Sequence, residues 1–181
     1  MRLWRVVPRV NLQSNDFELF GVPRRFTQDR AALDARWKDL QREAHPDKFA
    51  AQGAAAQRVA MQWSVRINEA YQRLKDPLKR AAYLCELDGA PINAHSNTAM
   101  PGAFLMQQMQ WREGLDEARD AQALDVLRDN VDAVQRDLIN VCARQLDELH
   151  DTSAAVQSVR SLMFIEKFAH DLERAFDKLE T

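Results

Sequence analysis

The chain has 181 residues, enough to bury a hydrophobic core and to form one domain or two small ones. Its 25 basic and 27 acidic side chains leave a net charge of −2, which gives no global electrostatic attraction for nucleic acid. The composition, 46% hydrophobic and 29% charged with five glycines, is typical of a globular helical protein, and no apolar stretch is long enough to span a membrane.

The N-terminal residues and the cysteines bear on the cellular compartment. We expect residues 1–14 to form an arm, since the first thirteen carry three arginines and no acid but contain no secretory core. A loose bacterial arm is the preferred interpretation, and a short mitochondrial-type presequence is the alternative. Cys85 and Cys142 each lie inside an apolar helical pattern, which indicates buried free thiols in a reducing compartment. We therefore place the protein in the cytoplasm.

The first predicted elements are two helices separated by a loop. A short helix over residues 15–20 is followed by Gly21 and Pro23, which mark a turn. Thr27 is the expected N-cap of the next helix. Apolar residues then recur at helical spacing from Leu33 to Ala44, so this second helix should bury one face.

The segment 45–49, His-Pro-Asp-Lys-Phe, follows that helix directly. Pro46 disfavours helical geometry at His45 and lacks an amide donor, so the helix should end there and the chain should reverse. Asp47 then offers a carboxylate on a turn, suited to a bidentate pair with an arginine of a partner. Lys38 and Arg42, four residues apart on the helix, form a small basic face beside the turn, although a solvated helix face would look the same.

After this turn we expect a long helix over residues 54–75 and a fourth over 77–87, which begins at Pro77. Residues 89–100 contain Gly, Pro, Asn and Ser without periodicity, and we interpret them as a linker. The domain that precedes this linker should span residues 15–88.

Residues 101–181 carry three further amphipathic patterns and should form an antiparallel three-helix bundle. The first helix runs from about residue 101 to 118. Asp151 begins the helix-capping segment that separates the second helix from the third. The apolar positions expected to face the core of the bundle are Leu124, Leu127, Val131, Val134, Leu138 and Val141 in the second helix, and Val156, Val159, Met163, Phe168, Leu172, Phe176 and Leu179 in the third.

The first bundle helix has two apolar faces. Phe104, Trp111, Leu115 and Ala118 fall on one side of a helical wheel, where they should pack into the bundle. A second set on the far side is rimmed by polar and acidic residues; it comprises Leu105, Met106 and Met109, bordered by Gln110, Glu113 and Glu117. Unpaired carboxylates resist burial, so this second face favours a docking surface over a fully buried helix.

The turn and the surrounding helices resemble a J-domain, the module with which co-chaperones activate the ATPase of an Hsp70-type chaperone. Together with the following bundle, nearly the whole chain resembles the HscB/Hsc20 (Jac1) family of co-chaperones of iron–sulfur cluster biogenesis. The Phe-Leu-Met segment is the most specific match, because ordinary J-proteins lack it. The matching stretches are residues 16–23, 40–49, 68–74, 77–84, 103–106 and 112–117.

The resemblance implies two partner-binding surfaces. The bundle would bind an IscU-type iron–sulfur scaffold protein, and the J-domain would dock on an HscA-type Hsp70 and stimulate its ATPase, so that cluster transfer follows. The family tends to have an acid where Gln110 stands. The scaffold-binding residues would be Leu105, Met106, Met109, Gln110, Glu113, Glu117 and Phe164, and the chaperone-binding residues would be His45, Pro46, Asp47, Lys38 and Arg42.

Other functions fit the sequence less well. His45 and Asp47 could form an acid/base pair, or ligate a metal with His95, His150 or His170, but the spacings match no tetrahedral site and no nucleophile has an evident base. We therefore expect no catalytic residue, metal or cofactor in this chain. A nucleic-acid adaptor is disfavoured by the net charge. The main alternative is a J-domain co-chaperone that serves a different client protein.

Overall fold

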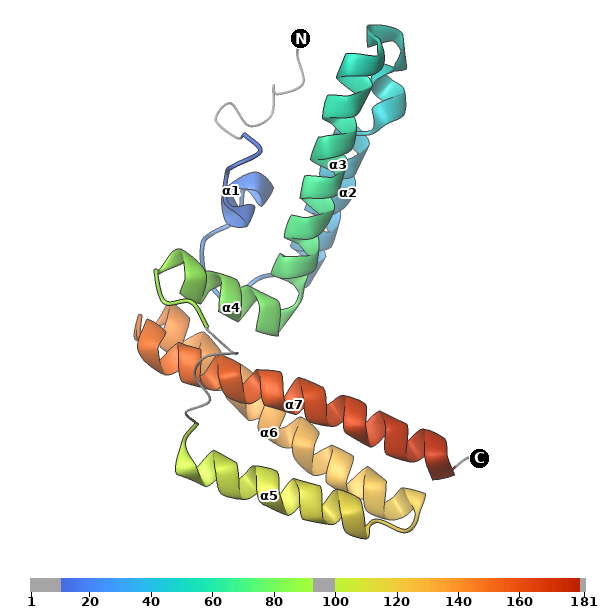
Figure 1. Ribbon diagram of the computed structural model, residues 1–181. Coiled ribbons are helices and arrows are strands. Elements are labelled where there is room, and N and C mark those ends of the chain that lie inside the picture. The colour runs from blue at the N-terminus through green and yellow to red at the C-terminus, as the bar shows by residue number, and fades with distance from the viewer. Residues whose placement is uncertain (1–10, 93–99, 180–181) are drawn as a thin grey trace. The chain divides into compact units, whose positions relative to one another are not determined.

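The computed structural model describes residues 11–92 and 100–179, which form seven α-helices and one 3-10 helix (Figure 1). No β-strand occurs among these residues, so the predicted all-α fold class is confirmed. No helix among them is long and apolar enough to cross a membrane. The helices are α1 (Asp16–Phe20), α2 (Arg30–Glu43), the 3-10 helix (Pro46–Gln52), α3 (Ala54–Lys75), α4 (Pro77–Leu87), α5 (Gly102–Glu117), α6 (Ala121–Asp147) and α7 (Thr152–Leu179).

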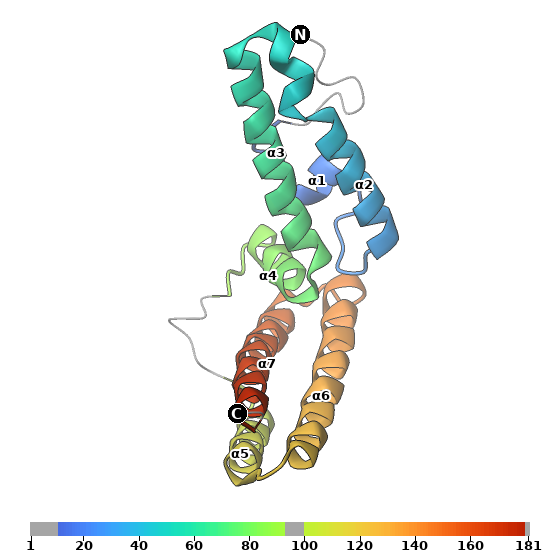
Figure 2. The ribbon, with the colours of Figure 1, turned by 90° about the vertical axis from the view of Figure 1, so that its right-hand side faces the viewer.

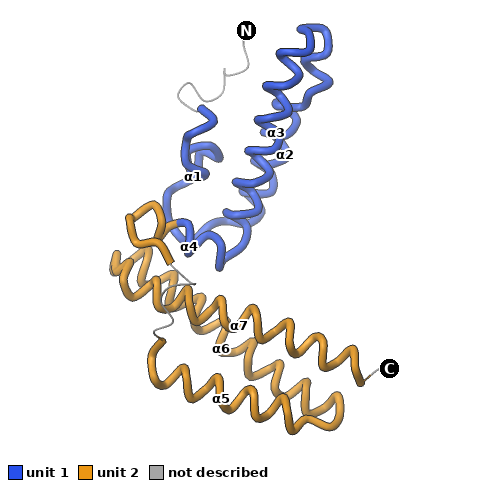
Figure 3. The backbone as a smooth tube through the Cα atoms, viewed as in Figure 1, with its two compact units in different colours: residues 1–83 blue, residues 84–181 orange. Residues whose placement is uncertain are grey.

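The chain divides into two compact units, residues 1–83 and 84–181, and the division falls inside α4 (Figure 3). In the first unit α2 and α3 form an antiparallel hairpin with the 3-10 helix at its tip, as Figures 1 and 2 both show. In the second unit α5, α6 and α7 form a three-helix bundle. Residues 1–10 of the expected arm and residues 93–99 of the expected linker lie outside the described residues.

Side-chain caps fix the starts of the first two helices. The Asn15 side chain accepts a hydrogen bond from the Glu18 amide at 2.9 Å, and Gly21 ends α1 with a φ of 64°, a conformation that glycine adopts without strain. The N-cap of α2 is Asp29, whose carboxylate accepts from the amides of the two residues after Arg30. The prediction of Thr27 as this cap was wrong, because the more strongly preferred Asp29 lies two residues further along.

A buried carboxylate fastens α1 to α3. Asp16 is fully buried and forms ion pairs with Arg66 (Nη2 to Oδ1, 2.6 Å) and Arg73 (Nε to Oδ2, 2.7 Å). Its backbone amide donates to the hydroxyl of Tyr83 at 3.1 Å. A buried charge is tolerated only when it is paired in this way. The short helix α1, too short to be stable by itself, is thereby held in place.

Aromatic and polar contacts set the register of α2 against α3. The rings of Trp37 and Tyr71 stack at 4.8 Å, and the indole Nε1 of Trp37 donates to Asn68 Oδ1 at 2.9 Å. Gln41 donates to the same oxygen at 2.7 Å and accepts from the Ser64 hydroxyl at 2.6 Å. These contacts add directional bonds to the apolar packing of the hairpin, so α2 cannot rotate without breaking them.

The core of the bundle is aromatic. Trp111 is buried, stacks on Phe168 at 5.7 Å and meets Phe104 edge-on at 6.1 Å. Leu115 and Ala118 pack against the same cluster, which confirms the predicted inward face of α5.

Three predicted core positions were wrong, one in α6 and two in α7. In α6 the buried residue is Cys142, while Val141 is exposed. A strict 3.5-residue repeat drifts about 20° per heptad on a straight helix of 3.6 residues per turn, so the inward position shifts by one residue. In α7 Leu162 is buried and Met163 is exposed, and Leu179 is exposed where the bundle ends.

Both cysteines are buried and free, as the sequence predicts. Burial raises the pKa of the Cys85 thiol to about 11 and that of Cys142 to about 12. Both thiols are therefore protonated and poorly reactive at neutral pH.

Replacing Asp16 by alanine should lower the free energy of unfolding by about 3 kcal/mol, because two cations would lose their buried partner. Chemical denaturation monitored by circular dichroism measures the change. Glu69→Ala removes an exposed carboxylate from α3 and should change stability by less than about 0.5 kcal/mol. An equal, small effect of both substitutions would show that the ion pairs contribute nothing.

Tyr71→Phe should raise the pKa of Asp34. The Tyr71 hydroxyl donates to Asp34 Oδ1 at 2.7 Å, and this bond, followed by the one from Arg30, holds the carboxyl pKa below its ordinary value. A lowered folded-state pKa adds stability above the unfolded pKa, and this contribution is lost as the pH falls through the folded value. The variant should therefore be destabilised at neutral pH and far less at about pH 2.

Carboxyl-carbon NMR titration measures this pKa directly. Tyr83→Phe, which removes a hydroxyl that does not contact Asp34, is the control and should leave the titration of Asp34 unchanged. An Asp34 pKa that stays the same in Tyr71→Phe would show that the hydrogen bond from the Tyr71 hydroxyl does not lower it.

Candidate functional site

The tip of the first unit is the turn that the sequence singled out. α2 ends at Glu43, and His45 has extended backbone geometry (φ −62°, ψ 126°) before Pro46 begins the 3-10 helix. The pyrrolidine ring excludes helical geometry from the preceding residue, which explains both the end of α2 and the reversal of the chain. Phe49 is buried and anchors the turn to the hairpin.

The side chains of this turn face solvent. Asp47 is 88% exposed, and its own amide donates to His45 Nδ1 at 3.3 Å. The same ring nitrogen lies 3.6 Å from Asp47 Oδ2. No lysine or arginine within the described residues forms an ion pair with Asp47. The carboxylate is therefore presented outward, where a cation of a partner can reach it.

The basic face beside the turn carries an ion pair that the sequence analysis missed. Arg42 is exposed on α2 and pairs with Asp39 at 3.0 Å, while Lys38 is exposed one turn earlier. The i,i+3 spacing of Asp39 and Arg42 could have revealed this pair. An exposed pair of this kind is weak, so Arg42 can exchange its partner at little cost.

The second apolar face of α5 is exposed. Leu105, Met106 and Met109 show 45%, 66% and 70% of their surface to solvent. The polar residues that border them, Gln110, Glu113 and Glu117, are exposed as well. A cluster of three large apolar side chains in water is typical of an interaction site, and methionine adapts its shape to a partner. We call these six residues the α5 patch.

Phe164 differs from the α5 patch because it belongs partly to the core. Its ring meets Phe104 edge-on at 5.9 Å, lies parallel to Phe168 at 6.2 Å and is partly buried. The guanidinium of Arg112 lies 5.5 Å from its centroid. The sequence analysis missed this cation–π contact, as it missed the exposure of Met163 beside it.

The residues weighed for metal binding are not brought together within the described part of the chain. No group of three or more His, Cys, Asp or Glu side chains there could hold a metal ion. His150 Nδ1 lies 3.2 Å from the carbonyl oxygen of Leu146, and His170 contacts Glu173 at 3.1 Å. His95 lies outside the described residues.

Known proteins resemble this chain along most of its length. A family model described as the HSCB C-terminal oligomerisation domain matches residues 100–173. A protein of Burkholderia cenocepacia named "Co-chaperone protein HscB homolog" is 48% identical over 175 residues, 95% of this chain and 99% of the relative. A protein of the same name from Bordetella petrii is 51% identical over 160 residues, 88% of this chain and 94% of the relative.

Solved structures agree with these relatives. Chaperone HscB from Vibrio cholerae has a TM-score of 0.78 and 37% identity, covering 92% of this chain and 99% of that one. The human co-chaperone protein HscB has a TM-score of 0.88 and 25% identity, covering 100% and 92%. These matches confirm the predicted J-domain followed by a helical bundle. The chain belongs to the HscB family of co-chaperones.

Proposed function

We propose that this co-chaperone binds an IscU-type iron–sulfur scaffold protein through its bundle and delivers it to an HscA-type Hsp70. Its J-domain stimulates the ATPase of that chaperone, and cluster transfer to acceptor proteins follows. The protein performs no chemistry itself.

The J-domain spans residues 15–88, the linker 89–100 and the scaffold-binding bundle 101–181. Two free buried thiols fit a reducing compartment, so we assign the protein to the cytoplasm.

The observation that carries this proposal is the exposure of the α5 patch. A general J-protein needs only the hairpin and its turn. In this chain, α5 has one apolar face packed in the core of the bundle and a second, exposed apolar face on the opposite side. Burying such a face against a partner stabilises the complex by roughly 25 cal/mol per Å² of apolar surface. The acidic rim of Glu113 and Glu117 favours a partner with basic groups around an apolar contact.

The two units act together by linkage. A co-chaperone can shift the conformational equilibrium of an Hsp70 only if it binds the activated arrangement more tightly than the resting one. Asp47 and His45 at the tip of the hairpin are suited to such a contact, with Pro46 holding the turn and Lys38 and Arg42 as nearby cations. Joining the scaffold-binding and chaperone-binding units raises the effective concentration of the scaffold near the chaperone.

A different client remains the second candidate. Gln110 stands on the rim of the α5 patch where the family tends to have an acid, so the negative charge of this rim is weaker. A client with fewer basic groups would tolerate that change. Direct binding of the scaffold distinguishes the two candidates.

Asp47→Ala and His45→Gln should each abolish stimulation of the HscA-type ATPase and leave scaffold binding unchanged, because the turn is exposed and distant in sequence from the α5 patch. Steady-state ATP hydrolysis and isothermal titration calorimetry measure the two activities. Glu43→Ala, which removes an exposed carboxylate from the same end of α2, is the matched control and should stimulate normally. Normal stimulation by both turn variants would refute the role of the turn.

Leu105→Ala combined with Met109→Ala should weaken scaffold binding by about 2–4 kcal/mol, as expected for a hot spot. Val126→Ala is the control, since Val126 is 67% exposed on α6 outside the α5 patch. Phe164→Ala should also weaken binding, but this side chain packs in the core, so its thermal stability must be measured alongside. A double variant that binds the scaffold like wild type would place the client site elsewhere.

A further inference from the structure

A polar cluster between α2 and α3 centres on a single atom, the side-chain oxygen of Asn68. This Oδ1 atom accepts hydrogen bonds from Trp37 Nε1 at 2.9 Å and from Gln41 Nε2 at 2.7 Å. Both donors belong to α2, which runs beside α3 in Figures 1 and 2. A carbonyl oxygen has two lone pairs, so the two bonds use its full accepting capacity. One residue of α3 therefore holds two consecutive turns of α2.

The amide of Gln41 is fixed from a second side by Ser64. Its Nε2 also donates to the Ser64 carbonyl oxygen at 3.1 Å, and its Oε1 accepts from the Ser64 hydroxyl at 2.6 Å. Ser64 precedes Asn68 on α3 by four residues, about one helical turn. Hydrogen bonds in several directions therefore attach Gln41 to two turns of α3.

Apolar packing alone leaves the rotation of α2 about its axis loosely determined. Of the residues of α2, all of which are described, only Leu33 and Leu40 are buried. They are seven residues apart and lie nearly on one line along the helix. Apolar contacts are non-directional, whereas hydrogen bonds weaken steeply when they are bent. The bonds to Asn68 thus select one rotation among those that the two leucines allow.

This rotation determines where the basic residues of α2 point. Lys38 and Arg42 are exposed, and each directly follows a residue that Asn68 holds, about 100° further around the helix. The side chains of a helix reach about 5–6 Å from its axis, so a rotation of about 20° moves both cations by about 2 Å relative to α3. His45 follows Gln41 by four residues, so the same rotation also displaces the start of the turn.

We propose that Asn68 is a positioning residue for activation of the Hsp70. Its amide oxygen fixes the rotation of α2 and thereby the direction in which Lys38, Arg42 and Asp47 meet the chaperone. This inference rests on the proposed function, since it requires that the Hsp70 binds this face of the J-domain. Asn68 acts through the two side chains that it holds and makes no contact with the chaperone itself.

The proposal has a kinetic signature that differs from the loss of a contact residue. Without the bonds to Asn68, α2 adopts several rotations, and the chaperone binds the one that presents its contact residues correctly. Binding to a fraction of the molecules raises the apparent dissociation constant in proportion, whereas the saturated complex is the same as in wild type. Loss of Asp47 instead removes a contact from the saturated complex.

The first test is ATPase stimulation by full-length Asn68→Leu, which removes both acceptor bonds and nearly conserves the side-chain volume at an exposed position. The concentration for half-maximal stimulation should rise roughly tenfold, as for a competent population of about one tenth, and the maximal stimulation should equal that of wild type. Asn68→Asp keeps an oxygen opposite both donors and should restore half-maximal stimulation to within about twofold of wild type.

The matched control is Gln72→Leu, which places the same side chain one turn further along α3, on another exposed position. It should stimulate like wild type at every concentration. The indole Nε1–H signal of Trp37 tests the hydrogen bond without the chaperone. Its exchange with solvent, measured by NMR, should be faster in Asn68→Leu than in wild type and unchanged in Gln72→Leu.

A double-mutant cycle separates positioning from direct contact. Trp37→Phe removes one donor but keeps a ring to stack on Tyr71. Added to Asn68→Leu, it should raise the concentration for half-maximal stimulation no further, because both substitutions break the same bond. Multiplication of the two effects would show that Asn68 contacts the chaperone itself, and this result would overturn the inference.

The remaining outcomes distinguish this inference from the function on which it rests. If wild type stimulates the HscA-type ATPase and Asn68→Leu has the same half-maximal concentration, the inference fails and the proposed function stands. A lowered maximum in Asn68→Leu, or no rescue by Asn68→Asp, would also overturn the inference alone. If wild type gives no stimulation, the proposed function fails and the inference fails with it.

Discussion

The rotation of α5 about its own axis is set by Trp111, and the exposed surface of the bundle depends on that rotation. The buried indole stacks on Phe168 and donates to Asn130 Oδ1 at 2.8 Å, so both its apolar face and its polar edge are engaged. Consecutive residues advance about 100° around a helix, which places Met106 and Met109 on the side opposite Trp111. A well-packed core and an unpartnered apolar face are therefore two results of one constraint.

Phe164 joins this core to the surface that we assign to docking. Its ring packs on Phe104 and Phe168 while Arg112 covers it from α5. A partner that contacts Phe164 would therefore meet a side chain whose position is already fixed, and rigid contact groups lose little entropy on binding. The hairpin of the J-domain obtains similar rigidity from Pro46 and from the contacts between α2 and α3.

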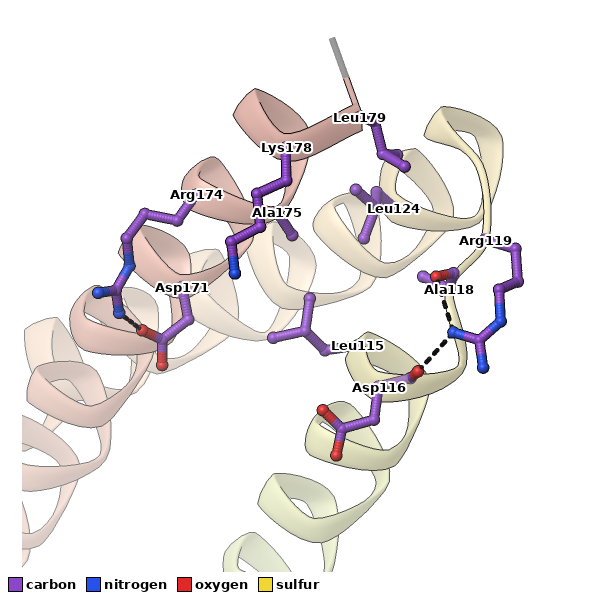
Figure 4. Close-up of a pocket in the computed structure, with 10 residues that line it drawn as sticks. All are labelled: Leu115, Asp116, Ala118, Arg119, Leu124, Asp171, Arg174, Ala175, Lys178 and Leu179. Carbon is purple, nitrogen blue, oxygen red and sulfur yellow. Dashed lines mark hydrogen bonds and ion pairs between the residues drawn. The ribbon is translucent and has the colours of Figure 1, made fainter. Parts of the chain in front are cut away.

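Much of this architecture could be predicted from the sequence, because helix periodicity and Pro and Gly positions report local structure. The bounds of α3 and α4 and the inward face of α5 follow from such signals. The burial of Cys142 instead of Val141 in α6 could not be predicted, because it depends on the exact number of residues per helical turn, which a short pattern does not determine. The hollow that Leu115, Leu124 and Ala175 line at one end of the bundle (Figure 4) was not predictable, because α5, α6 and α7 meet there only after the bundle has formed.

In the function that we propose, one chain couples scaffold binding to ATPase activation. Its most direct test is the steady-state ATPase rate of the HscA-type chaperone with this protein alone, with the scaffold alone and with both. Both together should stimulate hydrolysis by more than the product of their separate effects, and this synergy should disappear when the J-domain and the bundle are supplied as separate chains. Stimulation that is indifferent to the scaffold would contradict the coupling.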